Sequence, residues 1–247
     1  MNDNKPIIQI NDLYKSFKKK EVLRGVTLEV FSGEVLCVIG QSGSGKSVLI
    51  KHITNLLDQD SGRVFYMDQD ISKFNKKKIF SLRKDVSMLF QSGALFDSMD
   101  VFENLALPLQ EHTDFSNDKI EKLVAEKLNM VGMPGVEKLK PSELSGGMRK
   151  RVGLARSIIL EPKVIMYDEP TTGLDPIMSD VINKLVIDLN KRLNITSIVI
   201  THDMNSVYAI ADRVAMIFKG RIIFNGSVEE LQQSELKEVQ DFIHGKS

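Results

Sequence analysis

The chain has 247 residues, 42% of them hydrophobic and 27% charged, and its 33 lysines and arginines balance 33 aspartates and glutamates. This composition is typical of a globular protein with one large domain or two small lobes, and the balanced charge gives no reason to expect a nucleic-acid partner. No apolar run approaches the roughly 20 residues that a membrane-spanning helix needs, and residues 1–6 hold no apolar leader core, so we expect a cytoplasmic protein. The one cysteine, Cys37, excludes an internal disulfide and is predicted to be a small core residue.

The first thirty residues predict antiparallel strands. Apolar residues alternate along residues 8–13 and 22–30, and three lysines at 18–20 form a polar turn between the two runs. Phe17 is an aromatic residue among lysines and a serine. It could stack on an adenine ring, as aromatic rings do on bases, or cap the small sheet.

A glycine loop follows the apolar run at residues 35–39 and precedes apolar residues at helical spacing. Its sequence satisfies G-x-x-x-x-G-K-[ST], and strand, loop and helix are the context that this motif requires. The glycines let backbone N–H groups face an anion, and the helix that begins near Lys46 adds its positive dipole end. Lys46 is predicted to reach β- and γ-phosphates, and the Ser47 hydroxyl to ligate Mg²⁺. The candidate nucleotide-binding residues here are Gly40, Gln41, Ser42, Gly43, Ser44, Gly45, Lys46, Ser47 and Val48.

Residues 62–67 and 86–91 predict two further strands. Between them, residues 73–84 carry six lysines and arginines, which we interpret as a solvated helix face rather than a nucleic-acid patch. The second strand ends in Gln91. Its amide could reach a metal or an attacking water at the ligand crevice, or lie at the surface.

Strand signals are missing between about residues 92 and 162, which we interpret as a helical lobe inserted in an α/β core. Residues 95–109 form an apolar, loop-rich stretch bounded by Pro108, and residues 119–133 form an amphipathic helix. Part of this apolar surface is a candidate docking groove for a partner helix. The lobe ends in Ser145, Gly146 and Gly147 before a helix at 149–160, a second anion-binding nest that has no lysine of its own.

Two acids end the apolar strand at residues 164–169. Beside a phosphate loop, Asp168 is predicted to bind Mg²⁺ and Glu169 to polarise water for in-line attack on the γ-phosphorus. A turn at residues 173–176 then leads into a helix at 178–193, and the next strand, 195–200, is followed by His202. Because it lies at a strand end, His202 is a candidate contact to the γ-phosphate.

Taken together, these motifs resemble the nucleotide-binding subunit of ATP-binding cassette transporters over nearly the whole chain. The resemblance implies a P-loop NTPase core with a mainly parallel sheet, formed by about 1–91 and 162–247 together with an N-terminal antiparallel β subdomain, and a helical subdomain at about 92–161. It also implies an ATPase that uses ATP and Mg²⁺ and works as a head-to-tail dimer with a second copy of itself. The site residues it assigns are Lys46 and Ser47 in the loop, Phe17 on adenine, Gln91 sensing Mg²⁺ and the permease, Ser145 to Gly147 completing the partner's site, Asp168 on Mg²⁺, Glu169 as base, Asp175 coupling the two sites and His202 on the γ-phosphate.

A narrower resemblance is carried by residues 88–113, 141–148 and 173–177, which are similar to the ATPases of Mla-type phospholipid transporters. Met148 stands where most transport ATPases have glutamine, and this branch shares that departure. The resemblance implies an MlaE-type permease, an MCE-domain lipid-binding protein, a small STAS-domain subunit as a further candidate, and a place on the cytoplasmic face of the inner membrane. The chain ends soon after Ile243, so it offers little of the longer tail of some relatives.

Other classes fit less well. A DNA-repair cassette would need a long coiled-coil insertion, a translation factor of this superfamily would carry two cassettes, and an inactive cassette would be expected to lack Glu169 or His202. The serious alternative is the ATPase of an importer for amino acids or another small solute.

Overall fold

The computed structural model describes residues 5–246. Residues 1–4, which belong to the segment 1–6 where no leader is expected, lie outside the described residues, as does Ser247. The strands are β1 (Pro6–Phe17), β2 (Lys20–Phe31), β3 (Val35–Ile39), β4 (Ser61–Tyr66), β5 (Gln69–Asp70), β6 (Val86–Leu89), β7 (Val164–Asp168), β8 (Thr196–Ile200), β9 (Arg213–Phe218) and β10 (Arg221–Gly226). The helices are α1 (Lys46–Ile53), α2 (Lys76–Asp85), α3 (Val101–His112), α4 (Asn117–Met130), α5 (Gly146–Ile158), α6 (Pro176–Leu193), α7 (Met204–Ile210), α8 (Val228–Gln232) and α9 (Lys237–Ile243), with short 3₁₀ turns at Ile71–Lys73 and Pro141–Glu143.

Two sheets stand beside each other. The four-stranded sheet has the order β2-β1-β4-β5 and is antiparallel, as the alternating N-terminal pattern predicts. The six-stranded sheet has the order β10-β9-β3-β8-β7-β6, in which only the β9–β10 pair is antiparallel. The predicted mixed α/β fold is therefore confirmed.

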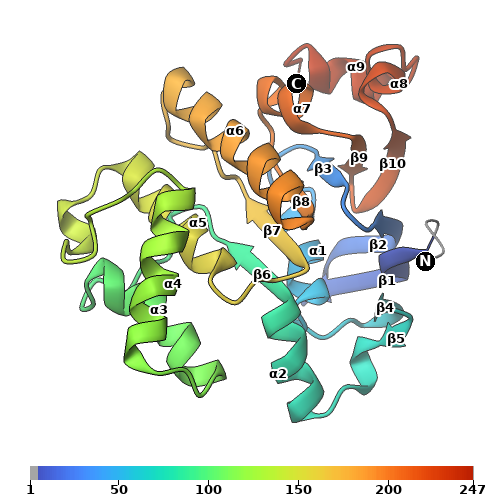
Figure 1. The fold of residues 1–247 in the computed structure, drawn as a ribbon. Helices are drawn as coiled ribbons and strands as arrows, with labels where there is room; N and C mark the ends of the chain where they lie inside the picture. The colour runs from blue at the N-terminus through green and yellow to red at the C-terminus, as the bar shows by residue number, and fades with distance from the viewer. Residues whose placement is uncertain (1–4, 247) are drawn as a thin grey trace.

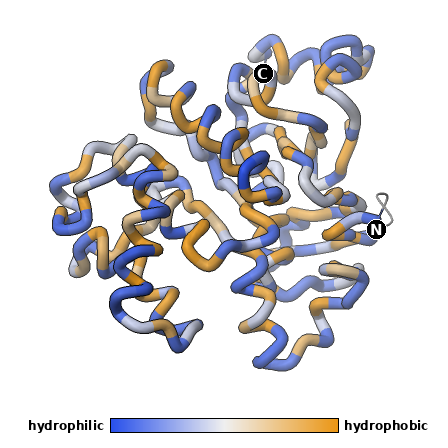
Figure 2. The backbone as a smooth tube through the Cα atoms, in the orientation of Figure 1, coloured by the Kyte–Doolittle hydropathy of each residue, from blue (hydrophilic) through white to orange (hydrophobic). Residues whose placement is uncertain are grey.

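Strand β3 divides the core into two parts because its successive side chains point to opposite faces of the sheet. Cys37 and Ile39 join a cluster with residues of α3, α4, α5, α6 and α7. Leu36 and Val38 join another cluster with residues of β1, β2 and α1. All five residues of β3 are buried, so this strand forms the middle layer between the antiparallel sheet and the main group of helices. Figure 2 shows hydrophobic residues along these central strands and a largely hydrophilic α2 at the periphery.

The helices α3, α4 and α5 group at one side of the molecule, away from the β1-β2-β4-β5 sheet (Figure 1). The described chain has no strand between β6 and β7, as the sequence predicts. Helix α5 lies against the loop after β6. A Cβ atom added at Gly153 would come within 3.0 Å of the Cα and O atoms of Gly93, so a larger residue would require the loop to shift. Arg156 holds the same loop by donating to the carbonyls of Gly93 (3.1 Å) and Ala94 (2.9 Å).

The loop-rich interpretation of residues 95–109 is wrong in its second half. Helix α3 continues from Val101 to His112 through Pro108. A capping box between Asp100 and Glu103 stabilises its start, and Leu105 is completely buried. Tertiary burial thus offsets the hydrogen bond that Pro108 cannot donate.

Other helix boundaries differ by two or three residues. Helices α5 and α6 begin earlier than predicted, at Gly146 and Pro176, because the Ser145 and Asp175 side chains cap them. Helix α2 begins at Lys76 rather than near 73 because Asn75 caps it.

No helix among the described residues is long and apolar enough to cross a membrane.

Replacing Cys37 by serine should lower stability and leave the activity close to that of the wild type. Cys37 is completely buried in β3, and this burial raises the pKa of its thiol, so it behaves as a small apolar residue. A serine hydroxyl at this position would be desolvated, which costs about 1–3 kcal/mol of unfolding free energy. Urea denaturation and turnover of the same sample measure both effects. Loss of activity in a folded variant would show that the thiol has a task.

Candidate functional site

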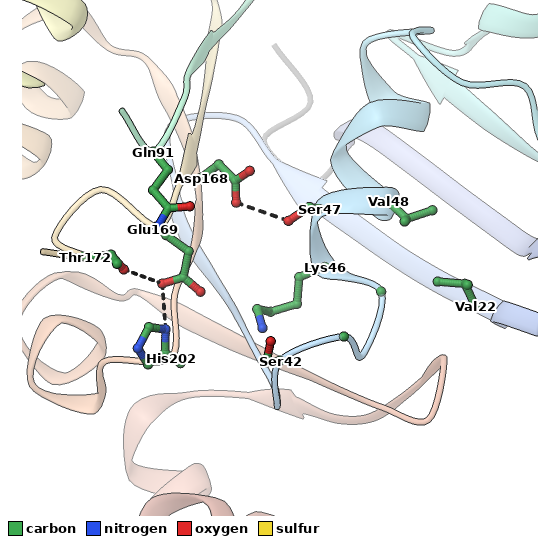
Figure 3. A pocket seen from close by; sticks show the side chains of 12 residues that line it. Val22, Ser42, Lys46, Ser47, Val48, Gln91, Asp168, Glu169, Thr172 and His202 are labelled. Carbon is green, nitrogen blue, oxygen red and sulfur yellow. Dashed lines mark hydrogen bonds and ion pairs between the residues drawn. The ribbon is translucent and has the colours of Figure 1, made fainter. Parts of the chain in front are cut away.

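The carboxyl ends of several parallel strands meet at one edge of the six-stranded sheet, where ligands bind in α/β proteins. The glycine loop follows β3, Gln91 follows β6, Asp168 ends β7 and His202 follows β8. A cavity of about 480 Å³ opens there (Figure 3). It is lined by Val22, Ser42, Gly43, Gly45, Lys46, Ser47, Val48, Gln91, Asp168, Glu169, Thr172 and His202.

At two positions of the glycine loop, a side chain would collide with a neighbouring strand. Gly45 has φ 112°, and a Cβ atom there would come within 2.8 Å of Leu23 Cδ2. At Gly40, with φ 149°, a Cβ atom would collide with the backbone oxygen of Ile217. The loop therefore packs closely against strands β2 and β9. Because its glycines carry no side chains, its N–H groups can approach an anion.

Lys46 is only 6% exposed although it lines the cavity. Its Nζ donates to the carbonyls of Gly40 (2.7 Å) and Gln41 (3.1 Å). Burial lowers the pKa of Lys46, while the carboxylates of Glu169 and Asp168 act in the opposite direction. The ammonium group is thus fixed within the loop and faces two acids across the cavity.

Ser47 and Asp168 form a candidate metal pair. The Ser47 hydroxyl donates to Asp168 Oδ1 at 3.3 Å. Burial is the main cause that raises the pKa of Asp168, and the hydrogen bond from Ser47 opposes it. Nowhere in residues 5–246 do three or more histidine, cysteine or acidic side chains gather as a metal cage. One hydroxyl and one carboxylate fit Mg²⁺, which keeps water and phosphate oxygens for its other positions.

Glu169 is held by three contacts beside the loop. Its backbone N–H donates to the Ile200 oxygen (2.9 Å). Its φ of 51° is unusual for a non-glycine residue. Its Oε2 accepts from the Thr172 hydroxyl (3.1 Å) and lies 2.8 Å from His202 Nδ1. In Figure 3 Glu169, Thr172 and His202 face Lys46 across the cavity. Thr172 was not predicted, and its place three residues after Glu169 is the only signal for it.

The cavity does not include every predicted residue. Phe17 is 44% exposed at the end of β1 and carries Lys15 Nζ 5.7 Å from its ring centre, outside the residues that line the cavity. Ser145 caps α5 by accepting from the Met148 N–H, and Asp175 caps α6. Neither the nest at Ser145 to Gly147 nor Asp175 is among the residues that line the cavity beside this chain's own loop. Val22 lines the cavity and was also missed; its strand alternation indicated burial only.

The chain is similar to known proteins along most of its length. Residues 23–172 match the family described as ABC transporter. The protein named intermembrane phospholipid transport ATP-binding protein MlaF is 40% identical in Haemophilus influenzae, covering 100% of this chain and 93% of that protein. Its namesake in Escherichia coli is 38% identical and covers 97% and 89%. A Mycobacterium tuberculosis protein named probable ribonucleotide transport ATP-binding protein mkl is 39% identical, over 97% of this chain and 67% of that protein.

Solved structures show the same fold. The ATP-binding cassette MJ0796, described as a dimer in a post-hydrolysis state bound to ADP and Pi, has a TM-score of 0.82 and 27% identity over 90% of this chain and 98% of its own. The protein cbiO1 from Clostridium perfringens, part of the ABC transporter complex cbiONQ, has a TM-score of 0.85 and 30% identity over 94% and 92%.

Proposed function

Because this chain belongs to the ABC transporter family of ATP-binding proteins, we propose that it is the ATP-hydrolysing subunit of a transporter that moves phospholipids between membranes. The ATPase activity is supported by one cavity, which is lined by Lys46 of the glycine loop, the Ser47–Asp168 pair and the Glu169–His202 pair. The phospholipid substrate is supported by the MlaF relatives and by the similarity of residues 88–113 and 141–148 to that branch.

The triphosphate would lie on the glycine loop, residues 40–47, with Val48 at the start of helix α1. Lys46 would exchange its bonds to the Gly40 and Gln41 carbonyls for charge-assisted bonds to phosphate oxygens. The N-terminus of α1 adds its dipole to the same anion.

Ser47 and Asp168 would hold Mg²⁺, with the Gln91 amide as a further oxygen ligand at the cavity wall. Bound there, Mg²⁺ would neutralise charge on the phosphate oxygens.

Glu169 would act as the general base. Its Oε2 takes the proton from water while the water oxygen bonds to the γ-phosphorus and the bond from that phosphorus to the β,γ-bridging oxygen breaks, giving ADP and phosphate. The Thr172 hydroxyl and His202 orient this carboxylate. When both ring nitrogens carry protons, His202 can donate to Glu169 and to the γ-phosphate together.

The nest at Ser145 to Gly147 has a role in a head-to-tail dimer. Ser145 and Gly146 are exposed, and this helix N-terminus without a lysine would bind the phosphates held by a second copy, with Asp175 at the junction of the two sites. Exposed Phe17 would stack on the adenine. Two structures of the cassette MJ0796 are described as dimeric, which supports this arrangement.

The chain would bind a membrane permease through its helical part. We propose a division into a nucleotide-binding core (about 1–91 and 162–247) and a helical subdomain (about 92–161). A hollow of about 200 Å³ where α2, α3 and α5 meet is lined by Arg83, Pro108 and His112 among others. Exposed Phe80 lies against the His112 ring, with centroids 4.1 Å apart. This surface suits a helix of an MlaE-type permease on the cytoplasmic face of the inner membrane, in a complex with an MCE-domain protein and, as a further candidate, a STAS-domain subunit.

An affinity pull-down of the tagged chain from native membranes tests the substrate class. We expect mass spectrometry to identify a multi-helix permease, an MCE-domain protein and bound phospholipid. A Lys46→Ala chain is the control, because the permease surface does not include Lys46. Recovery of a small-solute permease without an MCE-domain protein would leave the ATPase in place and overturn the lipid substrate.

A further inference from the structure

Lys150 is a buried lysine in the second turn of α5, only 6% exposed. Its Nζ donates to the carbonyl oxygens of Pro170 (2.7 Å) and Thr172 (2.6 Å). These carbonyls lie on either side of Thr171, immediately after Glu169. One ammonium group therefore holds the segment that carries the proposed base.

A second contact connects the same two parts of the chain. A Cβ atom at Gly147 would come within 2.6 Å of Met178 Cε, so the first turn of α5 lies directly against the start of α6. The turn at residues 173–175 lies between this contact and the Lys150 contacts. The beginning of α5 thus contacts the chain on both sides of this turn, at residues 170–172 and at Met178.

Electrostatics act in the same sense. Burial lowers the pKa of Lys150, and the Glu169 carboxylate is the group that opposes this change. The carboxylate of the proposed base therefore stabilises the charged form of Lys150 on α5.

We propose that Lys150 is a positioning residue that ties the Ser145 to Gly147 nest to the Glu169 segment of the same chain. The inference rests on the proposed function, in which this nest binds the partner copy's nucleotide. Engagement of the nest at one site then places the base at the other site, because both are fixed to one end of α5. Hydrolysis at the two sites is coupled in this way.

Lys150→Met tests whether the Lys150 contacts to the Pro170 and Thr172 carbonyls position the segment, since it removes the ammonium group and keeps an unbranched side chain. Lys127→Met is the matched control. Lys127 is also buried, at 1% exposure, but its Nζ bonds Glu126 and Glu161, both 3.0 Å away and remote from the site. We compare amide hydrogen exchange of residues 169–175 without nucleotide, and then ATP turnover, in purified full-length chains.

In Lys150→Met, exchange at 169–175 should become on the order of tenfold faster. The kcat should fall on the order of 100-fold, because a small displacement of a catalytic group can cost that much in rate. The KM for ATP should change little, and the Hill coefficient should fall to about that of two independent sites. Lys127→Met should change none of these. Lys150→Gln can still donate to a carbonyl and should lie between wild type and Lys150→Met, and it replaces Lys150→Met if that chain does not fold.

Unchanged exchange at 169–175, with the wild-type kcat and Hill coefficient, would overturn the role of Lys150. A wild-type chain that neither binds nor hydrolyses ATP would instead overturn the proposed function. The exchange comparison needs no nucleotide, so the two failures are distinguishable.

Discussion

Glu169→Gln is expected to lower the steady-state rate of ATP hydrolysis on the order of 10³-fold, within the range that a general base contributes, while ATP still binds. The amide keeps the shape of the side chain, and its NH2 group in the place of Oε2 can donate to the Thr172 hydroxyl, but it cannot take a proton from water. The proposed dimer should then persist with ATP bound, because only hydrolysis would release it.

The contact to His202 favours this trapped state. In the wild type, Oε2 of Glu169 lies 2.8 Å from Nδ1 of His202. In the variant, the new amide N–H can donate to Nδ1, so that a neutral ring carries its proton on the other nitrogen and can donate it to the γ-phosphate. The substitution thus removes the base without removing the phosphate contact.

Two measurements check this result. Phosphate release gives turnover, and size-exclusion chromatography with ATP and Mg²⁺ gives the dimer fraction. Glu121→Gln, an exposed substitution on α4, is the control and should behave as the wild type. If Glu169→Gln hydrolyses ATP at an unchanged rate, another group is the base.

Lys46→Ala should abolish nucleotide binding at the loop. Removing one partner of a desolvated charge pair costs about 2–5 kcal/mol, which raises Kd by roughly 30-fold to 4,000-fold. The variant also loses the bonds to the Gly40 and Gln41 carbonyls, so the loop itself becomes less ordered.

Calorimetric titration with ATP measures this loss, and thermal unfolding shows whether the fold remains. Lys51→Ala is the matched control, because Lys51 is an exposed lysine on the same helix and lies outside the cavity. An ATP affinity for Lys46→Ala within threefold of the wild type, roughly 0.7 kcal/mol, would remove Lys46 from the phosphate site.

Local patterns predicted most of the architecture. The alternation of apolar and polar residues predicted the N-terminal strands, and the apolar runs predicted β3, β7 and β8. The glycine-loop motif predicted the start of α1 to within a residue. The comparisons confirm the family that the ordered motifs indicate. The roles of all the proposed site residues, Phe17 and Asp175 included, stay predictions.

Errors arose where distant residues decide the outcome. Pro108 indicated a boundary, yet α3 passes through it because the burial of Leu105 stabilises the helix from outside. Thr172 was missed for a different reason: it lies only three residues after Glu169, and its contact with that carboxylate depends on the conformation of the turn after β7.

The sequence alone was sufficient to locate the loop proposed to bind phosphate, because its eight residues are contiguous and their conformation is local. It was also sufficient to locate the strand ends that carry the proposed catalytic residues, since acids and amides there follow directly on apolar runs. The tertiary structure alone decided which of these ends share a cavity, that His202 contacts Glu169, and that Lys150 is buried against the segment after it. The physical reason is that burial and hydrogen bonding between residues far apart in the chain depend on the order and direction of the strands, which no single segment encodes.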